Sequence, residues 1–283
     1  MLDKETEYIK LLEIFIQVVE ANKGKPVGSE QWILDAEGLA LKFCAHVVSA
    51  LYLFKGTIIP KMSFGHINFF DSASINVVCR AAFETFLIFH HIFIQPKSIE
   101  ERDFRYISWV LSGLIERQNF PILSQKGKKQ IQHEKQIIDS YINRLKTNLH
   151  FKALSSKQKR IIIEKGNWRF LSWADLAAKA GLDPTHGTSF YKYLCGYAHS
   201  SNLSALQIRE AQSKHIQREL SSSAMTLIMI SIANMIKAYC DLFPQSASVL
   251  KRDQGNNVLV DIWISVGSSS IKDAEIDWDN ILV

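Results

Sequence analysis

The sequence has few of the residues that build metal-bound or disulfide-bonded frameworks. Its four cysteines, Cys44, Cys79, Cys195 and Cys240, include no C-x-x-C pair and stand in apolar surroundings. This pattern argues against a zinc knuckle or a disulfide framework and is typical of small buried side chains in a reducing compartment. No two histidines have the H-E-x-x-H spacing of a zinc enzyme. We therefore predict no metal site and no cofactor.

Long uncharged runs and phosphate-binding glycine loops are also missing. The longest uncharged run, residues 220–236, is short and rich in serine, and the N-terminal MLDKETEYIK lacks the apolar core of a signal peptide. The glycine-containing stretches GTSFYKYLCG and GSSSIK lack the GK[ST] ending of a P-loop. We expect a cytoplasmic protein with no membrane contact.

Proline and glycine are scarce, with 6 and 13 residues in 283, and most fall between long segments of helical apolar period. The period predicts helices over residues 3–21, 30–54, 71–94, 98–118, 128–148, 157–164, 173–180, from 190 onward, 203–220 and 222–243. Residues 59–70 are rich in turn formers. Segments 39–54, 81–94 and 224–235 are apolar nearly all round and are predicted to lie at the centre of a bundle.

The last part of the chain has a different pattern. Between residues 258 and 266, valine and isoleucine alternate with other residues at a period of two, which predicts a strand or an extended docking arm. We therefore predict one all-α domain, a bundle of about eight to ten helices over residues 1–255. A short extended C-terminal arm over residues 256–283 is a candidate site for a protein partner.

Positive charge gathers in one segment. Between residues 125 and 160 ten lysines and arginines face two acidic residues, a net charge of +8, whereas the whole chain carries +5. Clustered lysines such as Lys128 and Lys129 suit the phosphates of RNA, which makes them candidate substrate-binding residues. The alternative is that a lysine-rich amphipathic helix presents only a solvated outer face.

Arg80 and Glu84 are out of place in CRAAFETFLIFHH, residues 79–91. They stand four residues apart on a helix whose other residues are mostly apolar, so both charges must be desolvated and hydrogen-bonded. Arginine placed before glutamate is also the weaker order for a surface pair. These two residues are candidates for a site.

His199 is the third residue of this kind. It ends the aromatic stretch FYKYLCGYA and is followed by Ser200, Ser201 and Asn202. A histidine near a helix end can transfer a proton and be oriented by neighbouring hydroxyl groups. If its helix packs against that of Arg80, the arginine would bind an oxyanion such as phosphate, and glutamate would orient one of the two. A purely structural ion network is the alternative.

The segments R-A-A-F-E, N-W-R-F-L-S-W-A-D-L-A-A-K-A-G-L and Y-K-Y-L-C-G-Y-A-H-S-S resemble a bacterial family of all-helical proteins of unassigned function. The resemblance covers residues 30–243 and, more distantly, extends to the HEPN superfamily of ribonucleases, which often act as anti-phage or toxin proteins. It implies a metal-independent endoribonuclease with Arg80, Glu84 and His199 as catalytic residues. HEPN ribonucleases carry their arginine and histidine on one helix, whereas Arg80 and His199 lie on two.

The resemblance also places Tyr191 and Ser200 near the site, and we add Tyr197 and Asn202 as candidate substrate-binding residues. RNA and a second copy of the chain are the candidate partners. The rival hypothesis is a non-catalytic sensor or assembly module, in which the network of Arg80, Glu84 and His199 is structural or binds a small anion. The sequence gives no RNA specificity and no activating or neutralising partner.

Overall fold

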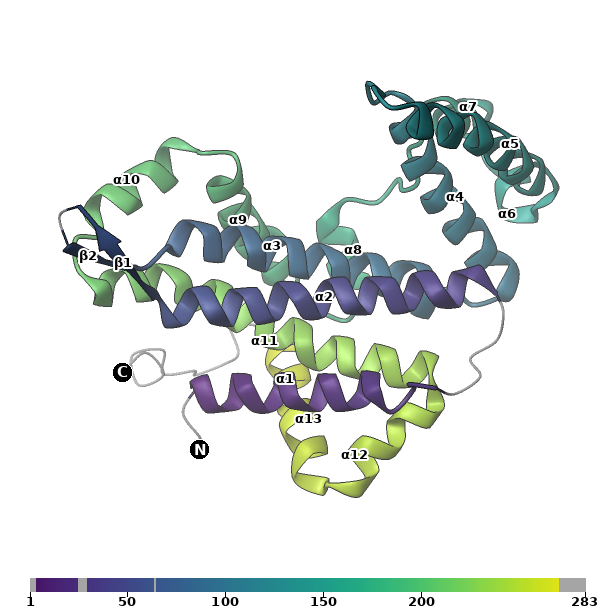
Figure 1. Cartoon of the computed structure of the whole chain (residues 1–283). Helices are drawn as coiled ribbons and strands as arrows, with labels where there is room; N and C mark the ends of the chain where they lie inside the picture. Colours follow the sequence, from purple (N-terminus) through teal and green to yellow (C-terminus); the bar gives the residue numbers. More distant parts are fainter. Residues whose placement is uncertain (1–3, 25–29, 64, 270–283) are drawn as a thin grey trace. The chain divides into compact units, whose positions relative to one another are not determined.

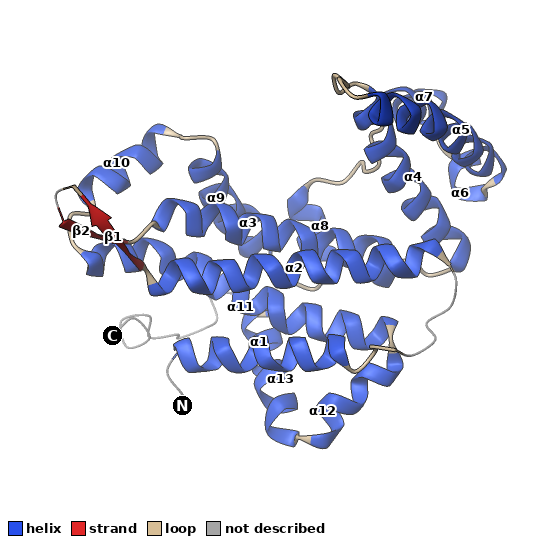
Figure 2. Cartoon of the chain, in the orientation of Figure 1, coloured by secondary structure: helices blue, strands red, loops and turns tan. Residues whose placement is uncertain are grey.

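The computed structural model describes residues 4–24, 30–63 and 65–269, and within these ranges the chain is almost entirely helical (Figures 1 and 2). Its thirteen α-helices there are α1 (Lys4–Glu20), α2 (Gln31–Lys55), α3 (Ser72–Phe89), α4 (Ile99–Gln118), α5 (Gln125–Thr147), α6 (Leu149–Lys152), α7 (Ser156–Lys165), α8 (Trp173–Lys179), α9 (Tyr191–Ala198), α10 (Asn202–Glu210), α11 (Lys214–Leu242), α12 (Ser248–Arg252) and α13 (Gln254–Ser268). The predicted all-α fold is confirmed. The count exceeds the prediction because helices as short as α6 and α12 show no apolar period.

The chain divides into two compact units. Residues 1–90 and 173–283 form the first, here called the core unit, and residues 91–172 form the second, the inserted unit. The division falls within a π-helical segment, His90–Ile94, that continues α3. We predicted that residues 1–255 form one domain, which means that they fold together. The division into two compact units does not test this, so it stays a prediction.

Helix α11 is the centre of the core unit, where it contacts α1, α2, α3 and α13. Its residues from Ala224 to Met235 are buried almost without exception, as predicted from their apolar character. Helix α3 is also buried along most of its length, through side chains such as Ile75, Phe83 and Phe86. Burying such faces supplies most of the stability of helices in proteins.

Helix α2 differs from the prediction that residues 39–54 lie at the centre. One face packs on α1, α3 and α11, but Leu41, Val48 and Tyr52 on the other face are exposed. A purely apolar composition cannot tell a surrounded helix from one that leaves an apolar face uncovered. The central position is therefore wrong for half of α2.

A β-hairpin follows α2, in the region for which the sequence predicts turns. Strands β1 (Thr57–Met62) and β2 (Gly65–Phe69) pair antiparallel, with Thr57 opposite Phe69 and an irregularity after Ile59. Gly56 ends α2 at a φ of 75°, which favours glycine. The β-branched residues that follow favour strand formation over a turn.

Two further boundaries differ from the predictions. Residues 254–268 form α13, so the predicted extended arm is wrong for this part, and residues 270–283 lie outside the described ranges. The buried Val260, Trp263 and Gly267 follow a helical spacing that the period of two conceals. The break between the last two long helices falls at residues 211–213, where Ser213 caps α11 by accepting from the N–H of Ile216.

The inserted unit is built around α4, which contacts α5, α6 and α7. The Glu134 side chain on α5 is fully buried and accepts hydrogen bonds from Arg117 Nε at 2.9 Å and Gln130 Nε2 at 2.7 Å. Helix α7 begins with a capping box at Ser155 and ends at Gly166, whose backbone is left-handed. These caps satisfy backbone groups that have no partner inside the helix.

Three described helical segments are long and apolar enough by composition to cross a membrane. They are Gln31–Lys55, Ser72–Ile94 and Lys214–Leu242. The share buried inside the protein rises from 28% in the first to 83% in the third. The cytoplasmic location stays a prediction.

Candidate functional site

The predicted pair of Arg80 and Glu84 lies on one face of α3. Arg80 Nε donates to Glu84 Oε1 at 2.8 Å, and the two side chains are 20% and 24% exposed. The opposite face of α3 buries Ile75, Ala82 and Phe86 in the core. The pair thus stands at the edge of the hydrophobic core, where water reaches it.

His199 meets this pair from α9. It is the C-cap residue of that helix, is exposed, and its Nε2 lies 3.3 Å from Arg80 Nη1. Helix α9 contacts α3, and its side chains Leu194 and Tyr197 are buried. A guanidinium group can only donate, so this contact is a hydrogen bond when Nε2 carries no proton and accepts. Sequence positions 119 residues apart therefore form one cluster.

Tyr191 completes what we call the α3–α9 cluster: Arg80, Glu84, Tyr191 and His199. Its hydroxyl donates to Glu84 Oε1 at 2.8 Å, and its ring lies under the Arg80 guanidinium, with Cζ 5.6 Å from the centroid. Burial and the bond to the carboxylate raise the pKa of the Tyr191 hydroxyl far above its ordinary value. Tyr191 is therefore a hydrogen-bond donor at neutral pH rather than a proton-transfer group.

The environment also holds Arg80 charged. Burial alone would lower the pKa of its guanidinium, but the hydrogen bond and charge of Glu84 outweigh burial and raise it. In the described part of the chain, Arg80 Nη2 has no hydrogen-bond partner. A permanently charged group with a free donor is suited to an oxyanion.

The remaining candidates near His199 lie around the turn between α9 and α10. Ser200 is exposed and has a φ of 51°, in the left-handed region that a non-glycine residue seldom occupies. Asn202 is exposed at the start of α10. The Tyr197 hydroxyl instead donates to Gln207 Oε1 at 3.1 Å and lies 3.3 Å from the Tyr193 hydroxyl, so its hydrogen bonds are not with the α3–α9 cluster.

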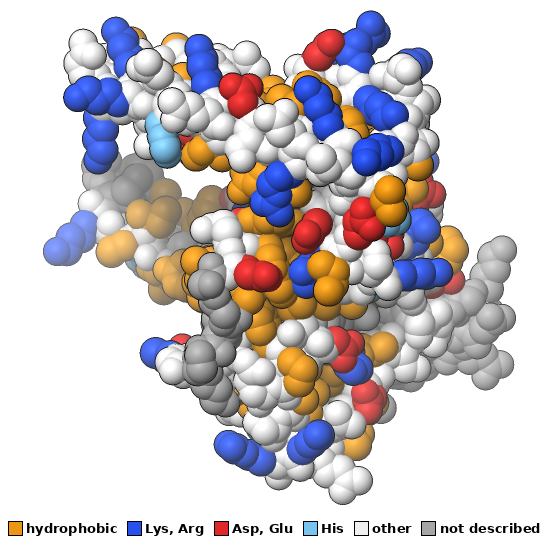
Figure 3. Space-filling view, turned by 90° about the vertical axis from the view of Figure 1, so that its right-hand side faces the viewer, with side chains coloured by type: hydrophobic (Ala, Val, Ile, Leu, Met, Phe, Trp, Pro, Cys, Tyr) orange, Lys and Arg blue, Asp and Glu red, His pale blue; other side chains and the backbone are white. Residues whose placement is uncertain are grey.

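Lys128 and Lys129 are exposed on α5 of the inserted unit. They belong to a different unit from the α3–α9 cluster. On the face drawn in Figure 3, lysine and arginine side chains are spread over the upper part and are separated by neutral and hydrophobic ones. Their role in RNA binding stays a prediction.

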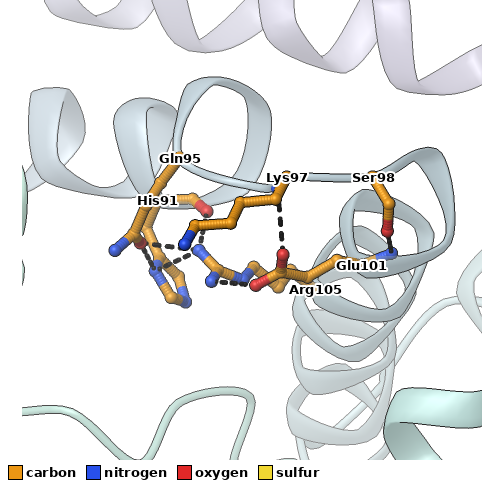
Figure 4. Close-up of polar contacts among 6 residues, drawn as sticks. All are labelled: His91, Gln95, Lys97, Ser98, Glu101 and Arg105. Atoms are coloured by element: carbon orange, nitrogen blue, oxygen red, sulfur yellow. Dashed lines mark hydrogen bonds and ion pairs between the residues drawn. The ribbon is translucent and has the colours of Figure 1, made fainter.

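A second group of the same residue types lies in the inserted unit and was not predicted. Figure 4 shows this α4 cluster of His91, Gln95, Glu101 and Arg105. Arg105 Nη1 lies 2.7 Å from the His91 carbonyl oxygen, 2.6 Å from Gln95 Oε1 and 3.0 Å from His91 Nδ1, and Nη2 bonds to Glu101. The available signal was the E-x-x-x-R spacing of Glu101 and Arg105, which is common on helix surfaces.

Sequence reasoning also missed the aromatic support of the α3–α9 cluster. The Tyr191 ring lies 6.1 Å from that of Trp173 and 6.4 Å from that of Phe83, measured between centroids. These rings fix the tyrosine that holds Glu84. Within the described ranges, no three His, Cys, Asp or Glu side chains are grouped so that they could hold a metal ion.

A model of a family of unknown function (DUF5677) matches residues 62–216, more than half of the chain. The chain belongs to this family. The DUF5677 segment contains the whole α3–α9 cluster and the whole α4 cluster, and ends at the start of α11. The predicted membership of a family of unassigned function is thereby confirmed. No curated protein and no solved structure matches the chain.

Proposed function

We propose that this DUF5677 protein is an HEPN-like, metal-independent endoribonuclease of an anti-phage or toxin system. In this proposal Arg80 binds a phosphodiester group, His199 moves the proton, and a cytoplasmic RNA is the substrate. The observation that carries it is the 3.3 Å contact between Arg80 Nη1 and His199 Nε2 at a surface open to water. A cation for the phosphate and an acid-base group are within reach of one reacting centre.

The proposed reaction uses the hydroxyl group next to the scissile bond. Arg80 donates to the phosphate, which frees His199 Nε2 to take the proton of the 2′-hydroxyl. The O2′–P bond forms and the P–O5′ bond breaks, which gives a 2′,3′-cyclic phosphate. The leaving O5′ takes a proton from water, and His199 returns its own proton to the hydroxide that remains.

Glu84 and Tyr191 act as positioning residues in this scheme. Glu84 Oε1 accepts from both Arg80 Nε and the Tyr191 hydroxyl, so it fixes the orientation of the guanidinium plane. Nη1 of that plane lies 3.3 Å from His199 Nε2, and Nη2 has no hydrogen-bond partner among the described residues. A pre-oriented guanidinium loses less freedom when it binds phosphate.

A second candidate function is a non-catalytic module that binds a small anion. It is favoured by the convergence of two donors on one oxygen of Glu84, which is typical of structural networks. Under this alternative the cluster binds phosphate through Arg80 but cleaves nothing. In that case a protein partner bound at the predicted C-terminal arm would respond to anion binding. Residues 270–283 of that arm lie outside the described ranges.

Cleavage of labelled single-stranded RNA in the presence of EDTA tests the proposal. Wild type is expected to yield 2′,3′-cyclic phosphate ends, and His199→Ala to lose about a hundredfold or more in rate. His199 is exposed, so this variant should fold normally. His133→Ala, which removes an exposed histidine of α5, is the matched control and should cleave like wild type.

Equal, negligible cleavage by wild type and His199→Ala would discard the ribonuclease. Thermal melting with inorganic phosphate then tests the anion-binding candidate. Phosphate should raise the melting temperature of wild type but not of Arg80→Lys, which keeps the charge and loses the planar fork. Equal shifts in both proteins would remove Arg80 from the binding site.

A further inference from the structure

The uncovered face of α2 carries a continuous apolar seam. Leu34, Leu41, Val48 and Tyr52 lie along it and are between 43% and 64% exposed. These four are the large side chains of a series of six that is completed by Gly38 and Ala45. The six positions, 34, 38, 41, 45, 48 and 52, are separated alternately by four and three residues. This is the spacing by which one helix packs along another in a coiled coil.

No contact with the described part of the chain requires a glycine at position 38. It is exposed in the middle of a 25-residue helix, and a Cβ atom built on it would meet nothing within 4 Å. Glycine at such a position costs about 1 kcal/mol relative to alanine. A glycine in an apolar seam instead permits close approach of another backbone, and none of the residues that the structure describes supplies one.

We propose that α2 packs antiparallel against α2 of a second copy, around a two-fold axis near Phe43. This register places Leu41 opposite Ala45 of the second copy and Gly38 opposite Val48 of the second copy. Each large side chain at the centre of the seam therefore meets a small one. Leu34 faces Tyr52 of the second copy at both ends, where two inclined helices diverge and leave more room.

The charges at the helix ends favour the antiparallel arrangement. Glu30 precedes α2, and Lys55 is its last residue. Antiparallel packing brings Glu30 next to Lys55 of the second copy at both ends, and opposes the two helix dipoles. A parallel pair would place Lys55 beside Lys55 and leave a void between two Gly38 residues. Within one chain Lys55 also lies 3.4 Å from Glu5, an exposed contact.

One residue opposes the association in this register. Lys42 is exposed beside the seam and only one position from Phe43, so the axis brings the two Lys42 side chains together. Like charges at this distance repel, and salt reduces the repulsion. A dimer of this geometry should therefore become tighter when Lys42 is neutralised.

Sedimentation velocity of the full chain, at concentrations up to about 100 μM, tests the proposal. Wild type is expected to be a dimer. Gly38→Trp should raise the dissociation constant about tenfold or more, because the new side chain holds the backbones apart. Its α2 should stay folded, since the position faces open space. Lys42→Gln should lower the dissociation constant several-fold.

Gly113→Trp is the matched control, because Gly113 is an exposed helical glycine of α4 with nothing within 4 Å of a built Cβ. It should associate like wild type. A wild type that stays monomeric, a dimer unaffected by Gly38→Trp, or a dimer weakened by Lys42→Gln would each overturn the antiparallel pairing. So would a monomer that binds phosphatidylglycerol vesicles through the seam, an outcome relevant because α2 is long and apolar enough to cross a membrane. The measurement does not depend on RNA cleavage.

Discussion

The core unit and the inserted unit each hold an arginine, a glutamate and a histidine in contact, yet the two clusters differ in how fully the arginine is used. Arg80 has two hydrogen-bond partners in the described chain, and the histidine among them is exposed. Arg105 is surrounded by acceptors on three residues, and His91 beside it is buried. The α4 cluster is thus satisfied, whereas the α3–α9 cluster has capacity for a ligand.

Residue types alone do not separate a structural network from a binding site. Both clusters contain an ion pair at a spacing of four residues on one helix. What differs is the fourth residue: Gln95 supplies an acceptor to Arg105, whereas its counterpart Tyr191 donates to Glu84 and leaves Arg80 Nη2 without a partner in the described chain. The number of acceptors around the guanidinium decides the difference.

The largest expected effect comes from removing the satisfied arginine. Arg105→Ala leaves the His91 carbonyl, Gln95 and Glu101 without their shared donor. We expect a loss of about 3 kcal/mol in the free energy of unfolding. Urea unfolding followed by circular dichroism measures this loss, and Arg160→Ala, which breaks an exposed pair at 3.8 Å, is the control. A loss no larger than that of the control would contradict a structural role for the α4 cluster.

Arg80→Ala should cost less, about 1 kcal/mol. Glu84 keeps the hydrogen bond from Tyr191 and reaches water, so no charge is left buried without a partner. The same urea measurement provides the comparison. If Arg80→Ala destabilised the protein as much as Arg105→Ala, both clusters would be structural, and the free Nη2 of Arg80 would no longer indicate a ligand site.

Acid should affect the α4 cluster through Glu101. Burial would raise the pKa of Glu101, but the Lys97 N–H and the Arg105 guanidinium outweigh it and lower the pKa below its ordinary value of 4.5. A carboxylate with a lower pKa in the folded state stabilises the protein above its unfolded pKa and loses this contribution as the pH falls. The melting temperatures of wild type and Glu101→Gln should therefore converge as the pH is lowered from about 6 to about 3. A difference that stayed constant over this range would contradict the assignment.

The smallest effect concerns the turn that presents His199. Ser200 has a positive φ, so Ser200→Gly should change the free energy of unfolding by no more than about 0.5 kcal/mol. Ser200→Val should be about 1 to 2 kcal/mol less stable than Ser200→Gly, because a β-branched side chain resists this conformation. Thermal melts of the two variants give the comparison. Equal stability would mean that the turn is not held in the left-handed region.

Much of the fold and part of the site could be predicted from the sequence. The apolar period located the long helices, and a charged pair on an apolar helix identified Arg80 and Glu84 before their contact with His199 was known. The spacing of apolar residues along a segment indicates which of its faces is buried. It therefore works best where a long segment is buried on a single side or on all sides.

The rest depends on tertiary contacts that a local pattern does not contain. The alternating valines and isoleucines of α13 resemble a strand, and only packing shows that Val260 and Trp263 face the core. Tyr191 and Tyr197 look equivalent in sequence, but one reaches Glu84 and the other Gln207. Likewise two of the acceptors around Arg105 come from His91, in the π-helical segment, and from Gln95 just after it, and no periodicity specifies the geometry of that segment.

Helix α5 buries few side chains against the rest of the inserted unit. Of its 23 residues only Glu134 and Leu145 are buried, and Glu134 is held by hydrogen bonds rather than by apolar contact. Its apolar stripe of Ile131, Ile138 and Ile142 is half-buried, so detaching this helix would uncover less hydrophobic surface than detaching α11, in which nearly every residue from Ala224 to Met235 is buried. We expect the amide protons of α5 to exchange with heavy water well before those of α11. The peptide bonds that follow the lysines of α5 should be the first that trypsin cuts.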